Sequence, residues 1–140
     1  MSALPESARP VIESDHLAHL VTMNRDGSPQ MSCVWVGLEG DEIVFASMSD
    51  RQKLRNLRRD PRIWLSIATG NRNTIGLEEY LVVHGTARIA VGRGAEVLQQ
   101  LAHTYLGPGV KFPPMRHSSP GFVVRITVER VGGVGPWSPD

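Results

Sequence analysis

A chain of 140 residues is long enough to bury one hydrophobic core and too short for two, so we expect a single domain over residues 1–140. Its composition, 41% hydrophobic and 21% charged, is typical of a globular protein and excludes a disordered or fibrous chain. The net charge of +1 argues against a broad nucleic-acid-binding surface, and the lone cysteine excludes an intrachain disulfide.

The hydropathy pattern argues against a membrane protein. No segment approaches the roughly 18–20 apolar residues that a membrane-spanning helix needs, and the first residues lack the basic region and apolar run of a secretory signal. We therefore expect a cytoplasmic protein that binds neither a membrane nor a nucleic acid.

The first half of the chain predicts an antiparallel meander. A short helix between residues 5 and 14, limited by Pro10, precedes three segments with the extended pattern of strands. An Asp26-Gly27 turn joins the first two, and a turn at 37–41 joins the second to the third. These strands are expected at 17–23, 30–36 and 42–47.

The second half begins with a helix of roughly ten residues. Ser49 or Asp50 is a suitable N-cap, and Asp60-Pro61 ends the helix because a residue before proline disfavours the helical conformation. Three further strands, an amphipathic helix that packs on the sheet and a proline-rich loop follow. These strands are expected at 62–69, 79–90 and 122–131, the amphipathic helix at 93–106 and the loop at 107–121.

Together these elements predict a mainly β fold with a few helices. Six strands in a largely antiparallel order, with helices after the third and the fifth, indicate a small closed or nearly closed barrel. Gly85 lies inside the long fifth strand, where a glycine marks a bulge or bend of the kind that turns a barrel corner.

Positive charge is concentrated in the helix after the third strand, where residues 50–59 hold five basic side chains and one acid. Leu54 and Leu57 share the face toward the barrel, and the arginines lie on another. A helix N-terminus attracts phosphate through its free N–H groups and its dipole, and Arg51 and Lys53 add charge there. Two interpretations remain open, a phosphate site and a solvated charged face.

An ordered series of motifs resembles the pyridoxamine 5′-phosphate oxidase-like split-barrel family over roughly residues 15–135. The resemblance implies a six-stranded antiparallel split β-barrel and a phosphorylated flavin or deazaflavin cofactor. The motifs are Leu20-Val21-Thr22-Met23, Asp26-Gly27-Ser28-Pro29-Gln30, Arg51-Gln52-Lys53-Leu54-Arg55-Asn56-Leu57, Asp60-Pro61-Arg62, Val83-His84-Gly85-Thr86-Ala87 and Val128-Glu129-Arg130-Val131-Gly132.

The resemblance also implies a set of cofactor-binding residues. In that family the start of the basic helix and the end of the strand before it hold the cofactor phosphate. The ring lies along the second strand, whose backbone hydrogen-bonds the pyrimidine edge, and a residue from the partner's fifth strand completes the pocket. The matching residues are Ser47, Arg51, Lys53 and Arg55 for the phosphate, Ser32, Cys33, Val34 and Trp35 for the ring, and Tyr80 for the pocket of the partner.

The expected function is that of a reductase. Members of the family that oxidise pyridoxamine phosphate carry an Arg-Lys pair where this chain has Gln52-Lys53. Short members with the pattern Asn-Leu-Arg-Arg-Asp-Pro, present here at 56–61, resemble reductases that depend on the deazaflavin coenzyme F420. We therefore expect reduced F420 to pass a hydride to a conjugated organic acceptor, with no residue assigned as proton donor.

Two alternatives remain open: an FMN-dependent oxidoreductase, and a protein that binds a flavin or deazaflavin without catalysis. Because F420 has a longer anionic tail than FMN, Arg55, Arg58 and Arg59 are its expected extra contacts. The histidines lack metal-ligand spacing, and Cys33 is expected to be a small core residue rather than a nucleophile. We expect a homodimer, because an isolated barrel of this size leaves the groove open and the apolar second and fifth strands uncovered.

Overall fold

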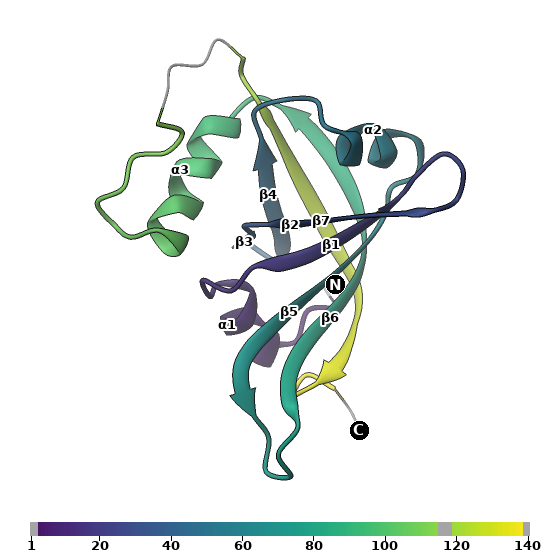
Figure 1. Cartoon of the computed structure of the whole chain (residues 1–140), viewed down its shortest axis with the longest axis vertical. Coiled ribbons are helices and arrows are strands. Elements are labelled where there is room, and N and C mark those ends of the chain that lie inside the picture. Colours follow the sequence, from purple (N-terminus) through teal and green to yellow (C-terminus); the bar gives the residue numbers. More distant parts are fainter. Residues whose placement is uncertain (1–2, 115–118, 139–140) are drawn as a thin grey trace.

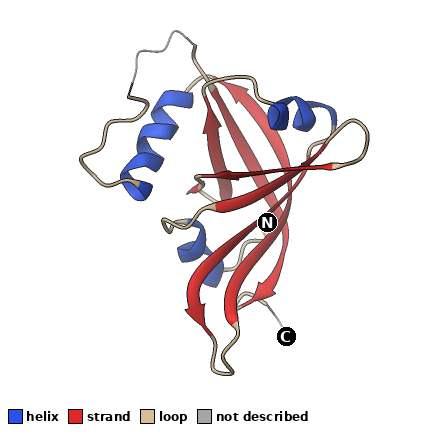
Figure 2. Cartoon of the chain, in the orientation of Figure 1, coloured by secondary structure: helices blue, strands red, loops and turns tan. Residues whose placement is uncertain are grey.

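The computed structural model describes residues 3–114 and 119–138, in which seven strands form one antiparallel sheet (Figure 1, Figure 2). Residues 115–118 of the predicted loop lie outside the described residues. In chain order the elements are α1 (Arg9–Ile12, after a 3-10 turn at Glu6–Ala8), β1 (Ala18–Met23), β2 (Pro29–Val34), β3 (Gly37–Glu39), β4 (Glu42–Ser47), α2 (Gln52–Arg59), β5 (Arg62–Arg72), β6 (Glu78–Val91), α3 (Gly94–Tyr105) and β7 (Phe122–Val134).

The strand order β2-β1-β5-β6-β7-β4-β3 gives the sheet the form of a split barrel. β2 and β3 are its two edges, yet they follow each other in the chain and are separated only by Trp35 and Val36. The sheet must therefore curl until its edges approach, and a chain connection joins them. The predicted mainly β, antiparallel split-barrel fold is confirmed.

All six predicted strands are present, and β3 adds a short seventh within the segment expected to be a turn. β3 pairs with β4 so that Glu39 lies opposite Glu42, which leaves only Gly40 and Asp41 in the turn. Gly40 has a φ of 63°, the left-handed conformation that two-residue hairpin turns favour. Three residues carry too little periodicity to reveal a strand, so β3 was recognisable only from its pairing with β4.

The predicted bulge at Gly85 is confirmed. Gly85 lies opposite Val128 while His84 lies opposite Arg130, so Glu129 is an extra residue on β7. A Cβ atom at position 85 would lie 2.6 Å from both Ile126 Cγ2 and the Thr127 carbonyl oxygen. Only glycine allows the two long strands to approach this closely where they bend.

The inward faces of the strands form the main hydrophobic core. The side chains of Leu20, Phe45 and Ile126 are almost completely buried there, and Leu54 and Leu57 of α2 close one end. Burying one such aliphatic or aromatic side chain stabilises the fold by about 1.5–3 kcal/mol relative to leaving it exposed. The predicted leucine face of α2 is therefore confirmed.

The helices lie around the sheet rather than within it (Figure 2). α3 packs on β4 and β7, where Val97 and Leu101 cover Val44 and Val123, as its amphipathic pattern predicts. α2 packs on β1 and β6, and α1 on β5 and β3. Within residues 3–114 and 119–138, none of the helices is long and apolar enough to cross a membrane.

Candidate cofactor-binding site

A groove lies beside the edge strand β2, between the end of β4, the start of α2, and α3 with the loop after it. Its larger part has a volume of about 440 Å³, and its smaller part about 240 Å³. Four residues line both parts, so they are compartments of one groove, with a total size typical of small-molecule sites. The shared residues are Val34, Ala46, Leu98 and Phe112.

The two compartments differ in chemistry. The larger one, here called the basic compartment, is lined by Ser47, Met48, Ser49, Arg51, Lys53, Pro113 and Pro114 besides the shared residues. The smaller one, here called the apolar compartment, adds Leu17, Cys33 and Trp35 and no charged residue. One end of the groove is therefore suited to an anion and the other to an uncharged ring.

The basic compartment lies at the N-terminus of α2. Arg51 is the N-cap residue, and no side chain among the described residues caps the helix. The predicted caps are thus wrong, because the Asp50 carboxylate instead pairs with Arg58 at 2.7 Å and Ser49 accepts a 2.7 Å hydrogen bond from Ser47 Oγ through its carbonyl oxygen. The first N–H groups of α2 consequently keep their affinity for an anion.

Lys53 is half-buried beside the exposed Arg51. Within the described part of the chain, neither side chain forms an ion pair with a carboxylate. Burial from water, together with the nearby Arg51 charge, lowers the pKa of Lys53 below its ordinary value. Two uncompensated cations in a partly apolar groove fit a phosphate group, which would restore the charge balance.

Arg55 does not join the two cations that line the basic compartment. Its guanidinium is exposed and donates hydrogen bonds to the Asp50 carbonyl oxygen at 2.5 Å and to Gln52 Oε1 at 3.0 Å. Of the four residues expected at the phosphate, Ser47, Arg51 and Lys53 therefore lie together, whereas Arg55 is held on the outer side of the helix by its own contacts.

The arginines at the end of α2 are also engaged. Arg58 pairs with Asp50 and lies 5.6 Å from the centre of the Phe122 ring, and Arg59 donates a hydrogen bond to the Met23 carbonyl oxygen. Neither residue lines the groove. Their expected contact with a long anionic tail would require these contacts to break.

Three of the four residues expected at the ring line the apolar compartment: Cys33, Val34 and Trp35. Ser32 lies opposite Leu20 on the inward side of β2, and its buried Oγ has no hydrogen-bond partner among the described residues. Among the described strands β2 is an edge, so one side of its backbone forms no sheet hydrogen bonds and is available to the polar edge of a planar ring.

Cys33 is exposed, and its predicted place in the core is wrong. Successive side chains of a strand point to opposite faces, so the inward position of Ser32 places Cys33 outward. The thiol therefore borders the groove instead of filling the barrel.

Trp35 and Phe112, which line the apolar compartment, form a row of three aromatic rings with Tyr105. Trp35 stacks on Tyr105 with ring centres 5.4 Å apart, and it makes an edge-type contact with Phe112 with ring centres 5.1 Å apart. The Tyr105 hydroxyl accepts a 3.1 Å hydrogen bond from the Val36 N–H, and burial raises its pKa. Sequence reasoning missed Phe112, because its segment carries no periodic pattern.

Tyr80 lies apart from the groove of its own chain. It pairs with Ala68 and Val134 in the sheet, and its side chain is 42% exposed. Its expected role in the site of a partner subunit stays a prediction.

A buried polar network fixes α2 on the β1–β2 hairpin. The Asn56 side chain is completely buried; its amide donates to Thr22 Oγ1 at 3.1 Å and Asn24 Oδ1 at 2.9 Å, and its Oδ1 accepts from Gln52 Nε2 at 2.8 Å. Such satisfied networks specify one arrangement of the packed elements. Asn56 therefore sets the direction in which α2 presents Arg51 and Lys53.

The chain thus combines an antiparallel split barrel with a basic and partly apolar groove beside its edge strand β2. A family model described as pyridoxamine 5′-phosphate oxidase matches residues 4–135. The chain belongs to this family of flavin-binding oxidoreductases, as the motif series predicted.

Several solved structures share this fold. An F420 reductase has a TM-score of 0.74 at 23% identity, covering 92% of this chain and 98% of that one. A conserved hypothetical protein from Mycobacterium tuberculosis has the same TM-score and identity, with 98% and 87% covered. An FAD-binding protein from Mesorhizobium loti has a TM-score of 0.62 at 20% identity, with 89% and 88% covered. Among curated protein sequences, none matches this chain significantly.

Proposed function

We propose that this protein is a reductase that uses the deazaflavin coenzyme F420 and acts on a conjugated organic acceptor. The observation that carries the proposal is the pair of cations, Arg51 and Lys53, that lack a carboxylate partner among the described residues and open onto an apolar compartment. The similarity in fold to an F420 reductase supports the choice of cofactor.

In this proposal the residues of the groove bind and orient the cofactor. Arg51 and Lys53 neutralise its phosphate, and the free edge of β2 aligns its ring. The bound, reduced deazaflavin would supply a hydride and become oxidised, and the conjugated double bond of the acceptor would gain that hydride and a proton. No carboxyl group or imidazole is among the described residues that line the groove, and we propose that water supplies this proton.

One observation favours FMN as a second candidate. FMN carries a single phosphate, for which Arg51 and Lys53 suffice, whereas the longer tail of F420 was expected to meet Arg55, Arg58 and Arg59. These three arginines already contact their own chain. An FMN-dependent oxidoreductase would use the same groove.

Equilibrium binding of FMN and of F420 to cofactor-free protein, measured side by side, separates the candidates. Tighter binding of F420, with a preference that declines in the Arg58→Ala/Arg59→Ala protein, supports the proposal. Tighter binding of FMN supports the second candidate, and binding of neither contradicts both. Binding without reduction of any quinone or nitroaromatic acceptor would favour the non-catalytic alternative.

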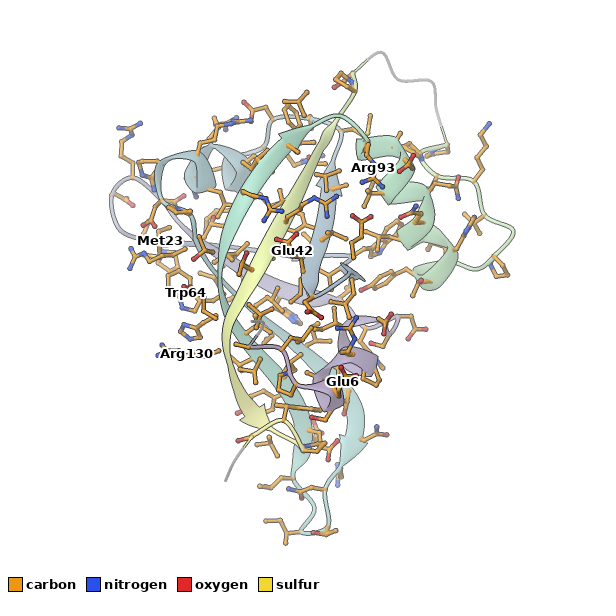
Figure 3. The ribbon with its side chains drawn as sticks, turned by 180° about the vertical axis from the view of Figure 1, so that it is seen from behind. Glu6, Met23, Glu42, Trp64, Arg93 and Arg130 are labelled. Carbon is orange, nitrogen blue, oxygen red and sulfur yellow. The ribbon has the colours of Figure 1, made fainter. Side chains whose placement is uncertain are left out.

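We also propose that the protein acts as a homodimer. Met31 on β2 remains 66% exposed, beside Val21 of β1 and Trp64 of β5 on the outer face of the sheet. Figure 3 shows Trp64 and Arg130 projecting from this same side. A second copy would cover this face and bring Tyr80 near a groove. Light scattering that gives a monomer mass at micromolar concentration would contradict the dimer.

A further inference from the structure

The side chain of Gln99 hydrogen-bonds the backbone of the loop after α3 at two points. Its Oε1 accepts a 2.9 Å hydrogen bond from the Phe112 N–H, and its Nε2 donates a 2.8 Å hydrogen bond to the Val110 carbonyl oxygen. The same Nε2 lies 3.0 Å from His103 Nε2. The glutamine amide therefore pairs with the loop backbone much as a neighbouring strand would.

The segment that Gln99 holds is part of the groove wall. Phe112 lines both compartments, and Pro113 and Pro114 line the basic one. The Phe112 ring also contacts Trp35 in an edge-type arrangement, with ring centres 5.1 Å apart. A loop that borders both compartments must stay in one position for the groove to keep its shape.

We infer that Gln99 is a positioning residue that holds Phe112 as the wall between the two compartments and so contributes to cofactor affinity without touching the cofactor. Gln99 itself does not line the groove. The inference rests on the proposed function for its effect on binding, whereas its effect on the loop does not depend on any cofactor.

The loop effect has a direct test because the chain contains only two lysines, Lys53 and Lys111. Lys111 is exposed, and the bond after it leads to the Phe112 N–H that Gln99 holds. A lysine-specific endoproteinase needs this segment to open before it can cut. Loss of both Gln99 hydrogen bonds in Gln99→Met should speed cleavage after Lys111 about fivefold to a hundredfold.

Gln100→Met is the matched control. Gln100 is the next residue on α3, it is exposed, and it makes no hydrogen bond to the loop among the described contacts. We expect its cleavage rate to equal that of the wild-type protein. Equal rates for Gln99→Met and wild type would overturn the inference.

The binding effect is tested with FMN and F420 as probes. Gln99→Met should weaken the binding of whichever probe the wild-type protein binds by about threefold to tenfold, the equivalent of one neutral hydrogen bond. In Phe112→Ala protein, adding Gln99→Met should change the affinity for the probe little, because Gln99 acts through Phe112. A double variant whose loss of affinity equals the sum of the two single losses would overturn this role.

The two hypotheses fail in different ways. The proposed function fails if neither FMN nor F420 binds the wild-type protein and neither slows its cleavage after Lys111. In that case the difference in cleavage rate between Gln99→Met and Gln100→Met protein still decides whether Gln99 holds the loop. If a probe binds and protects the loop but Gln99→Met leaves both affinity and cleavage unchanged, the positioning role of Gln99 is overturned and the proposed function stands.

Discussion

Two groups of cations in this molecule have opposite surroundings. On the outer side of β4, β6 and β7, arginines face carboxylates: Arg88 binds Glu42 through two hydrogen bonds, and Arg125 lies 2.7 Å from Glu39. Arg93 joins this ion-pair cluster through Glu39 and Glu96; Glu42 and Arg93 are labelled in Figure 3. In the basic compartment, Arg51 and Lys53 have no such partner among the described residues.

The pKa shifts express the same difference. The hydrogen bond from Arg88 outweighs burial and lowers the pKa of Glu42, which means that the fold stabilises its charged form. Burial lowers the pKa of Lys53, which means that the fold destabilises its charged form. The paired charges contribute modestly to the stability of the fold, whereas the unpaired cations are suited to a ligand that brings its own negative charge.

The largest expected effect comes from removing an unpaired cation. Lys53→Ala should weaken cofactor binding by about tenfold to more than a hundredfold, because a charge-assisted hydrogen bond to phosphate contributes roughly 1.5–3 kcal/mol. Arg59→Ala, which removes a cation outside the groove, should cost much less for FMN. Isothermal titration calorimetry checks both, and an unchanged cofactor affinity in Lys53→Ala protein would reduce the basic helix to a solvated charged face.

The comparison also predicts effects of opposite sign on stability. Lys53→Met should leave the cofactor-free protein at least as stable as wild type, because it removes a partly desolvated charge that has no described partner. Arg88→Met should destabilise it by up to about 1 kcal/mol, the usual range for an exposed ion pair. Urea unfolding measures both, with Lys111→Met as the control for replacing an exposed lysine.

The pH dependence of stability should distinguish the ion-pair cluster. Because the folded pKa of Glu42 is below its ordinary value of 4.5, its contribution is fully present above that pH and is lost as the pH falls through the folded pKa. Glu42→Gln should therefore be less stable than wild type near neutrality and converge with it in acid. A stability difference that does not change with pH would contradict this account.

The smallest effect is expected at Cys33. Although its thiol borders the apolar compartment, the proposed chemistry uses no covalent cysteine step. Cys33→Ser should leave turnover nearly unchanged in a reductase assay. Loss of turnover with folding and cofactor affinity preserved would assign the thiol a role that the proposal lacks.

The features that could be predicted from the sequence depend on residues close to one another in the chain. The Asp26-Gly27 turn, the leucine face of α2 and the glycine at the bulge each carry a local signal, and the order of motifs was enough to identify the family. Lys53 was found because charge at a helix start is visible in the sequence.

The missed features depend on contacts distant in the chain. β3 exists because β4 pairs with it, and Asp50 fails as a cap because Arg58 takes its carboxylate. Asn56 is buried only because Thr22 and Asn24 satisfy its amide, and nothing local marks Gln99 as the residue that holds Phe112. A polar side chain whose hydrogen-bond partners are distant in the chain is easily mistaken for a surface residue when only the sequence is considered.

The most direct test of the unpaired-cation site is the titration of Lys53 itself by NMR, in protein labelled with ¹³C at the lysine Cε atoms. The chain has only two lysines, so two signals are expected, and Lys111→Met protein assigns them. We predict that Lys53 titrates below the ordinary lysine value in the cofactor-free protein and that FMN or F420 raises its pKa. A Lys53 titration that is ordinary without cofactor and unchanged with it would contradict the account.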